Sequence, residues 1–260
     1  MAIDKLQKQI INEFSGDNVQ KKYIQMAEDD GLWEAEEKLI KKYFTKKGAT
    51  IIDLGCGTGR TTIPLVNQKF EVIGVDLTPK MIENAKKIAK KKKLKINYQV
   101  GDAAHLDFND NTFDYALFSN QGWTQIPGVE KRKKALKEVR RVLKRNGIYI
   151  FTFHPRLWFT RYFFFWIWKS FKFYIIRNIG FKIEEETFGD RFFDRESSNF
   201  YDKEEKRYIH ARYKTKQYIH IPSIKEVKKQ VTETGFQILY LGNGLKSKSK
   251  IKSIFVVCKK

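Results

Sequence analysis

The chain has little of several residue types, and each shortage excludes a class of protein. Its two cysteines among 260 residues, Cys56 and Cys258, are too few and too far apart for a disulfide framework or a cysteine-based metal site. No run of about 18 uncharged apolar residues occurs, so no ordinary membrane-spanning helix is expected. The opening MAIDKLQKQIINEF lacks the apolar core of a secretory signal. We therefore expect a cytoplasmic protein that needs no metal.

Acidic residues are scarce relative to basic ones. The chain has 30 Asp and Glu and 51 Lys and Arg, which gives a formal net charge of +21. A positive field of this kind can attract nucleic acid, anionic lipid or an acidic substrate. The cations are scattered and not held in one block, which is also typical of a Lys-rich solvated surface. Charge alone therefore leaves the class of partner open. Hydrophobic residues make up 42% of the chain, enough to bury a core.

Short apolar runs alternate with helical patterns from residue 49 onward. The expected strands are ATIIDLG, FEVIGVD, KINYQVGD, TFDYALFS, IYIFTFH, QILYLG and IFVVCKK. Between them lie amphipathic segments such as TPKMIENAKKIAKKKK, with Thr78 as N-cap and Pro79 at the first helical position. A second helix, EKRKKALKEVRRVLKRNG, is expected to stop at Asn146-Gly147. Such alternation predicts a mostly parallel α/β sheet with right-handed crossovers.

Four segments follow from this pattern. Residues 1–48 are expected to be helical and polar, and residues 49–154 to form the α/β core. Residues 155–217 interrupt the alternation and are rich in aromatic and charged side chains. Residues 218–260 return to the core with a helix capped by Ser223 and the last two strands, joined by the basic loop NGLKSKSKIK.

A glycine-rich turn, DLGCGTG, follows the first strand and opens a helix. Its glycines let the chain turn sharply and approach a ligand closely, and ligands in such sheets bind beyond the carboxyl ends of the strands. The dinucleotide fingerprint G-x-G-x-x-G would need glycine at position 60, which is Arg60. Asp53, two residues before the first glycine, is a poor neighbour for a pyrophosphate and a good one for an amino-bearing ligand.

This arrangement resembles the class I S-adenosylmethionine-dependent methyltransferases. The resemblance includes the turn, the segment VIGVDLTPKMIENAKK, the segment GDAAHLDF and the block ALKEVRRVLKRNGIYIFTFH, in the family's order. It implies a seven-stranded Rossmann-like sheet with the last strand antiparallel, helices on both faces and an insertion after strand five. It also implies that Asp76 binds the ribose hydroxyls, that Asp102 accepts from the adenine amino group and that the Ala103 N–H donates to a ring nitrogen.

The expected cofactor is S-adenosyl-L-methionine, with S-adenosyl-L-homocysteine as product. The expected cofactor-binding residues are Asp53, Gly55, Cys56, Gly57, Gly59, Asp76, Leu77, Met81, Asp102, Ala103 and Asn120. Three of the acids also have simpler roles open to them: Asp53 as a cap in the turn, Asp76 as a helix N-terminal charge and Asp102 as a turn residue. Cys56 is expected to pack as a small residue and not to act as a nucleophile.

Groups after strands four and five are expected near the methyl-transfer point. Asn120 and His154 are the candidate catalytic residues, with His154 as a general base or, alternatively, as a histidine satisfied by backbone at a strand end. Trp123, Trp158 and Tyr162 are the candidate substrate-binding residues. The segment after strand four, NQGW, lacks the prolines of the family's nucleobase amino-methyltransferases, which weakens that function.

The stretch RYFFFWIWK, residues 161–169, holds six aromatic side chains in nine residues. A lid over the substrate pocket, a buried or dimer-forming helix and an interfacial amphipathic helix all fit this composition. The acidic and aromatic run 183–214 is expected to form antiparallel strands or loop that complete the same cap.

We expect a methyltransferase that acts on a small molecule. RNA, favoured by charge alone, and a lipid or quinone at a membrane surface remain alternative acceptors, and a non-catalytic cofactor-binding scaffold is the alternative outside enzymes. The sequence leaves the oligomeric state open.

Overall fold

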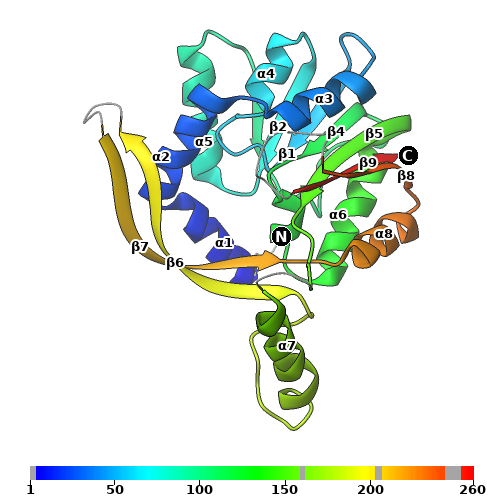
Figure 1. The fold of residues 1–260 in the computed structure, drawn as a ribbon. Coiled ribbons are helices and arrows are strands. Elements are labelled where there is room, and N and C mark those ends of the chain that lie inside the picture. Colours follow the sequence, from blue (N-terminus) through cyan, green and yellow to red (C-terminus); the bar gives the residue numbers. More distant parts are fainter. Residues whose placement is uncertain (1–3, 159–161, 203–206, 244–252) are drawn as a thin grey trace.

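A seven-stranded sheet with helices on both faces forms the body of the molecule (Figure 1). The computed structural model describes residues 4–158, 162–202, 207–243 and 253–260, and of the side chains of residues 194–216 nothing is described. The strands are β1 (Thr50–Leu54), β2 (Glu71–Asp76), β3 (Asn97–Val100), β4 (Phe113–Phe118), β5 (Leu143–Phe153), β8 (Gln237–Gly242) and β9 (Ile254–Lys259). Their order is β3-β2-β1-β4-β5-β9-β8, with β9 antiparallel to both of its neighbours. This confirms the predicted fold class.

Residues on the sheet alternate between two apolar layers, as the period of a strand requires. The helices that cover the sheet are α3 (Glu34–Tyr43), α4 (Thr62–Asn67), α5 (Pro79–Lys91), α6 (Val129–Val142) and α8 (Ile224–Glu233). Ile51 packs with α3 and α4, whereas its neighbour Ile52 packs with α6 and α8. Figure 1 shows the sheet between these two groups of helices.

The predicted stop of the second helix at Asn146-Gly147 is wrong. Helix α6 ends at Val142, and both residues lie inside β5. Leu143 already pairs with Phe113, and the register then jumps to Tyr115 opposite Ile148. The extra residues form a bulge, in which Asn146 takes a φ of 65°. The Asn-Gly pair therefore marks a turn within the strand and not a helix end.

The N-terminal segment is helical, as expected, and lies across one end of the sheet. It contains α1 (Lys5–Ser15), α2 (Asp17–Gln25) and a π-helical turn, η1 (Met26–Asp30), before α3. Asp4 caps α1 by accepting from the Gln7 N–H at 2.7 Å. Helices α1 and α2 both contact α5, so this segment covers the carboxyl ends of the first strands.

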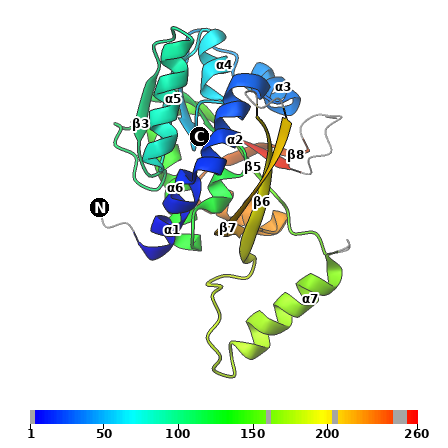
Figure 2. The same cartoon turned by 90° about the vertical axis from the view of Figure 1, so that its left-hand side faces the viewer.

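The insertion after β5 has two parts that go in different directions (Figures 1 and 2). Helix α7 (Phe163–Phe171) and the π-helical turn η3 (Lys172–Ile176) project away from the sheet. The strands β6 (Asp190–Asp202) and β7 (Arg207–His220) form an antiparallel hairpin along the outer side of α1 and α2. Arg161, most of the predicted basic loop (244–252) and residues 203–206 lie outside the described residues.

Candidate active site

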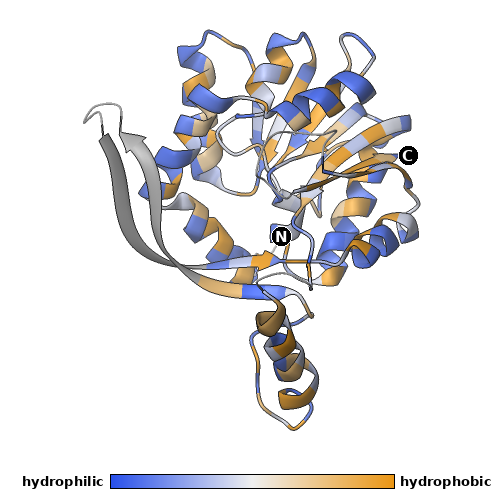
Figure 3. Ribbon diagram, viewed as in Figure 1, coloured by the Kyte–Doolittle hydropathy of each residue, from blue (hydrophilic) through white to orange (hydrophobic). Residues whose placement is uncertain are grey.

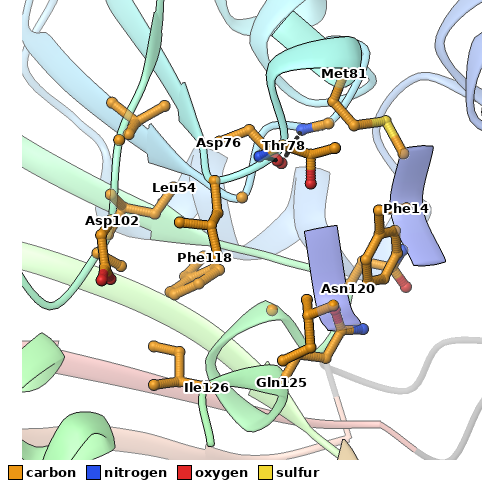
Figure 4. Close-up of a pocket in the computed structure, with 18 of the residues that line it drawn as sticks. Phe14, Leu54, Asp76, Thr78, Met81, Asp102, Phe118, Asn120, Gln125 and Ile126 are labelled. Carbon is orange, nitrogen blue, oxygen red and sulfur yellow. Dashed lines mark hydrogen bonds between the residues drawn. The ribbon is translucent and has the colours of Figure 1, made fainter. Parts of the chain in front are cut away.

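A hollow opens beyond the carboxyl ends of β1, β2, β3 and β4, where the sheet meets α1 and α2 (Figure 4). It contains about 830 Å³ of empty space, a figure that includes its open mouth. Its lining is mostly apolar and includes Leu54, Val75, Met81, Phe118 and Ile126. A few polar groups converge on it, as in a ligand site and not in a core void.

The glycine-rich turn forms one wall of the hollow. Gly55 and Gly57 line it and have φ of 58° and 56°, in the left-handed region that favours glycine. A Cβ at Gly55 would lie 2.6 Å from the ring of Phe118, so the turn and the end of β4 need this glycine for close packing. The turn is held to β2 by the Gly57 N–H, which donates to the Asp76 carboxylate at 2.9 Å.

Asp76 presents its carboxylate to the hollow at the end of β2. One oxygen accepts from the Gly57 N–H and the other accepts from the Thr78 N–H at 2.8 Å. Burial raises the pKa of Asp76 above its ordinary value, although both N–H donors oppose this shift. Each carboxylate oxygen retains lone pairs, so the group can still accept from two neighbouring hydroxyls. This geometry fits the ribose role that the resemblance implies.

Asp102 and Ala103 also line the hollow, after β3. Asp102 accepts from the Ala104 N–H at 2.8 Å, and its second oxygen accepts from the Gln7 side-chain amide of α1 at 2.9 Å. Asp102 therefore has both a turn role and a contact with the N-terminal helix. Its proposed contact with adenine stays a prediction.

The residues that cover the hollow were not expected from the sequence. Gln7, Ile10 and Phe14 come from α1 and Tyr23 from α2, and all four line the hollow. In the view of Figure 4, Phe14 lies between Met81 and Asn120, on the side away from Asp102. The signals that were available are the Asp4-to-Gln7 capping box and the apolar spacing of Ile10 and Phe14.

Three of the expected cofactor residues lie behind the lining and not on it. Asp53 is fully buried, and one carboxylate oxygen accepts from the hydroxyls of Thr61 and Thr62 at 2.7 and 2.6 Å. Burial raises the pKa of Asp53 to about 6. Cys56 is buried against α5, where burial raises the pKa of its thiol well above its ordinary value. Gly59 packs against Tyr98.

Arg60, which occupies the place of the third dinucleotide glycine, makes a buried ion pair. Its guanidinium donates to both carboxylate oxygens of Glu36 on α3, each at 2.7 Å, and to the Gly31 carbonyl. The Trp33 ring lies 3.9 Å from the guanidinium carbon. Ser119 joins the cluster through hydrogen bonds with Glu36 and Arg60, and it also lines the hollow. Glu36 was not identified from the sequence.

The candidate catalytic and substrate residues are not brought together. Asn120 lines the hollow, with a φ of 48° just after β4. His154 is half-buried at the end of β5 and is not among the lining residues. Trp123 is fully buried in the core, and its indole N–H donates to the Arg132 carbonyl. Trp158 stacks near Phe188 in the insertion, and the exposed Tyr162 begins the projecting helix. The roles of His154, Trp123, Trp158 and Tyr162 stay predictions, and none of these four residues lines the hollow.

Few groups that titrate near neutral pH face the hollow. Among the described lining residues there is no His, Lys, Arg or Cys, and the ionisable side chains are Asp76, Asp102 and Tyr23. Over residues 4–158, 162–202, 207–243 and 253–260, no cluster of three or more His, Cys, Asp or Glu could hold a metal ion. The same residues contain no helix long and apolar enough to cross a membrane.

The sheet order, the position of the hollow and the glycine-rich turn define a class I S-adenosylmethionine-dependent methyltransferase fold. Residues 51–147 match the family described as Methyltransferase domain. The matched part of the chain is the α/β core that carries the motifs. The match contains Asp53, the glycine-rich turn, Asp76 and Asp102.

A curated relative, a demethylmenaquinone methyltransferase of Staphylococcus aureus, is 34% identical over 142 residues, which are 51% of this chain and 56% of that protein. The chain thus spans about half the length of the curated relatives it matches. A S-adenosylmethionine-dependent methyltransferase of Methanosarcina mazei has a TM-score of 0.66 at 22% identity, over 88% of this chain and 98% of the other. A Burkholderia thailandensis 1,6-didemethyltoxoflavin-N1-methyltransferase, solved with bound S-adenosylhomocysteine, has a TM-score of 0.62 at 13% identity, over 100% and 91%.

Proposed function

We propose that the chain is an enzyme that transfers the methyl group of S-adenosylmethionine to a small-molecule acceptor. The observation that carries this proposal is the position of the Asp76 carboxylate. Two backbone N–H donors, of Gly57 and Thr78, hold it beside the glycine-rich turn, and its remaining lone pairs are available to a ligand in the hollow. The matched methyltransferase domain supports the same conclusion. A scaffold without ligand would gain nothing from a carboxylate held in this way against the unfavourable effect of its burial.

The residues that line the hollow fit the expected cofactor. Asp76 would hold the ribose hydroxyls, and the backbone of Gly55 and Gly57 allows close approach of the chain beside them. Asp102 and the Ala103 N–H would face the adenine edge at the other end. Apolar side chains between these polar groups, among them Leu77 and Met81, would contact the faces of the bound molecule.

Positioning is the main contribution that these residues can make to the reaction. S-Adenosylmethionine supplies an activated sulfonium methyl group when it is bound. Phe14, Phe118 and Ile126 line an apolar part of the hollow that excludes water from the transfer point. Because the described lining offers no histidine or lysine as base, we propose an acceptor whose nucleophile needs little deprotonation, such as a neutral amine or an enolate. The half-buried His154 would have to act from outside this lining.

The class of acceptor follows from the shape and chemistry of the hollow. The mostly apolar lining favours a small, largely apolar molecule over a polymer. The name of the Staphylococcus aureus relative, a demethylmenaquinone methyltransferase, supports a quinone-like acceptor. RNA would be favoured by basic side chains around the hollow, and none of the described residues that line it is basic. Because both cysteines are free and buried, we propose the reducing cytoplasm as the location.

Ligand-dependent thermal unfolding tests the proposal. S-Adenosylmethionine and S-adenosylhomocysteine, but not NAD, are expected to raise the midpoint by mass action, by the equivalent of about 2.7 kcal/mol at a hundred times Kd. Asp76→Ala is expected to abolish the rise. The matched control is Asp110→Ala, which removes an exposed aspartate paired with Arg141 far from the hollow. An equal rise for Asp76→Ala and wild type would overturn the ribose assignment, and no rise for wild type would overturn the function.

A further inference from the structure

Helix α7 and the turn η3 form a projecting arm with an unusual surface. Figure 3 shows the arm as the most hydrophobic element outside the core, at the end of the molecule farthest from α4 and α5. The large apolar side chains that it exposes are Phe164, Ile167, Trp168, Phe171, Tyr174 and Ile175, and the flanking Tyr162, Ile179 and Phe181 are exposed too. Phe164 is 79% exposed and Trp168 is 58% exposed. Monomeric proteins rarely expose a contiguous apolar patch of this kind without a partner.

The exposed side chains follow helical spacing. Positions 164, 167, 168, 171, 174 and 175 recur at intervals of three and four residues, so they form one stripe along the arm. In a surface helix of a globular protein, such a stripe faces the core. Here it faces outward, and we call it the outer stripe.

The opposite side of the arm packs against residues 185–190, the segment that connects the arm to β6. Lys169 donates to Glu185 at 2.6 Å and to the Asp190 carbonyl at 2.6 Å, and its side chain is only 13% exposed. Lys172 also pairs with Glu185. Trp166 is buried and packs edge-on against Phe188. The arm is therefore anchored through its polar side, and its orientation is fixed with the apolar stripe outward.

We propose that the outer stripe binds the surface of an anionic lipid bilayer. Charge favours this partner over a second copy of the chain, because the protein carries a net +21 and would repel its own copies. Two exposed cations, Arg177 and Lys182, follow the stripe along the chain and can attract lipid phosphates. Trp168 and Tyr174 combine an apolar body with a polar tip, which suits the boundary between head groups and acyl chains.

The arm is too short to span a bilayer, so it would lie in the interface. Helix α7 has 9 residues and η3 has 5, whereas a spanning helix needs about 20. Charged residues flanking an aromatic stripe are typical of interfacial helices. The proposal concerns the arm alone and does not depend on the methyl-transfer function, because no residue of the arm lines the hollow.

Co-sedimentation with vesicles tests the proposal on the full chain. Wild type is expected to bind vesicles of phosphatidylcholine with phosphatidylglycerol and to bind pure phosphatidylcholine more weakly. Phe164→Ser with Trp168→Ser is expected to lower binding on the order of tenfold for each side chain removed. Leu239→Ser is the matched control, since Leu239 is 40% exposed on β8, away from the arm, and it should bind as wild type does.

A second pair of variants tests the charge without altering the stripe. Lys182→Glu should weaken binding to the anionic vesicles, whereas Lys137→Glu, an equal charge change on the exposed face of α6, should have a smaller effect. Sedimentation velocity without lipid is the final control. Three outcomes would each overturn the proposal. Wild type could fail to bind the anionic vesicles, or the Leu239→Ser control could lose as much binding as the Phe164→Ser, Trp168→Ser double variant. Third, wild type could form a dimer in the absence of lipid that the double variant does not form. An unchanged thermal shift with S-adenosylmethionine in the arm variant would show that the cofactor site is intact.

Discussion

Arg60 and Glu36 form a buried bidentate ion pair, with two guanidinium nitrogens each 2.7 Å from a carboxylate oxygen. The pair joins the glycine-rich turn to α3. It also reaches Ser119, which lies beside Asn120 in the lining of the hollow. Position 60, at which the dinucleotide fingerprint needs glycine, thus carries an arginine that fixes α3 against the wall of the hollow.

Loss of one partner of this pair should destabilise the fold strongly. Glu36→Gln leaves the Arg60 charge buried without its carboxylate, and we expect a loss of about 3–5 kcal/mol in the free energy of unfolding. Urea unfolding measures this. Glu34→Gln, on the same helix, removes the exposed pair with Lys38 and should cost less than about 1 kcal/mol. Similar losses in the free energy of unfolding for the two variants would show that the buried pair contributes no more to stability than the exposed pair.

Asp53 should make stability fall as pH rises. Burial raises its folded pKa to about 6, above the ordinary 3.8, so the folded state holds the proton more tightly than the unfolded state. The stabilisation is complete below the unfolded pKa and is lost as pH rises through the folded pKa, by about 2 kcal/mol between roughly pH 4 and pH 8. Asp53→Asn removes this titration. The prediction fails if the unfolding free energies of variant and wild type run parallel over this range.

Gly59→Ala should destabilise the protein through a clash as well as backbone strain. Gly59 has a φ of 98°, and an added Cβ would lie 2.4 Å from the Tyr98 hydroxyl oxygen. We expect a loss above about 2 kcal/mol. Tyr98→Phe in the same chain removes that oxygen and should restore part of the loss. Gly48→Ala is the control. Gly48 has a φ of 61° and an added Cβ would meet no other atom, so this variant reports the backbone strain alone. A loss no larger than that of the control would contradict the clash.

The base of the β6–β7 hairpin should be sensitive to acid. Asp190 accepts from Tyr218 and lies 2.8 Å from a ring nitrogen of His220, whose other ring nitrogen lies 2.7 Å from Glu226 on α8. Burial by itself would raise the pKa of Asp190, but the hydrogen bond and charge of His220 outweigh it and lower the pKa to about 2.

Because this folded pKa is below the unfolded 3.8, the stabilisation is present above the unfolded pKa and is lost as pH falls through the folded one. Between about pH 5 and pH 3 the loss should be about 1 kcal/mol. Asp190→Asn should lack this component, which urea unfolding at the two pH values detects. An Asp190→Asn curve with the same acid dependence as wild type would assign the sensitivity to other carboxylates.

Periodicity made the core predictable. Runs such as TIIDL and EVIGVD allow only one kind of element, because each is short, apolar and bounded by turn residues. The glycine-rich turn then fixed which edge of the sheet carries the site. The boundary at Asn146 was misjudged because an Asn-Gly pair permits a left-handed residue in a bulge as readily as at a helix end.

Contacts between distant residues were not predictable in this way. The hydrogen bond from Gln7 to Asp102 joins residues 95 positions apart and ties α1 to the segment after β3. Residues of α1, and not the described part of the aromatic insertion, line the hollow. Trp123 follows strand four as a substrate residue would, yet its indole is directed into the core toward Arg132. No local pattern distinguishes these outcomes.

The sequence by itself determined which segments form the strands of the α/β core and where the glycine-rich turn lies, since both depend on local spacing and backbone freedom. Only the tertiary structure decided which side of RYFFFWIWK meets solvent. Aromatic composition is the same in a buried helix and an exposed one, so it does not tell which side packs. In the structure Lys169 pairs with Glu185, and Trp166 packs against Phe188 on the same side of the arm. These contacts join residues that are distant along the chain, so only the tertiary structure shows that the outer stripe is exposed.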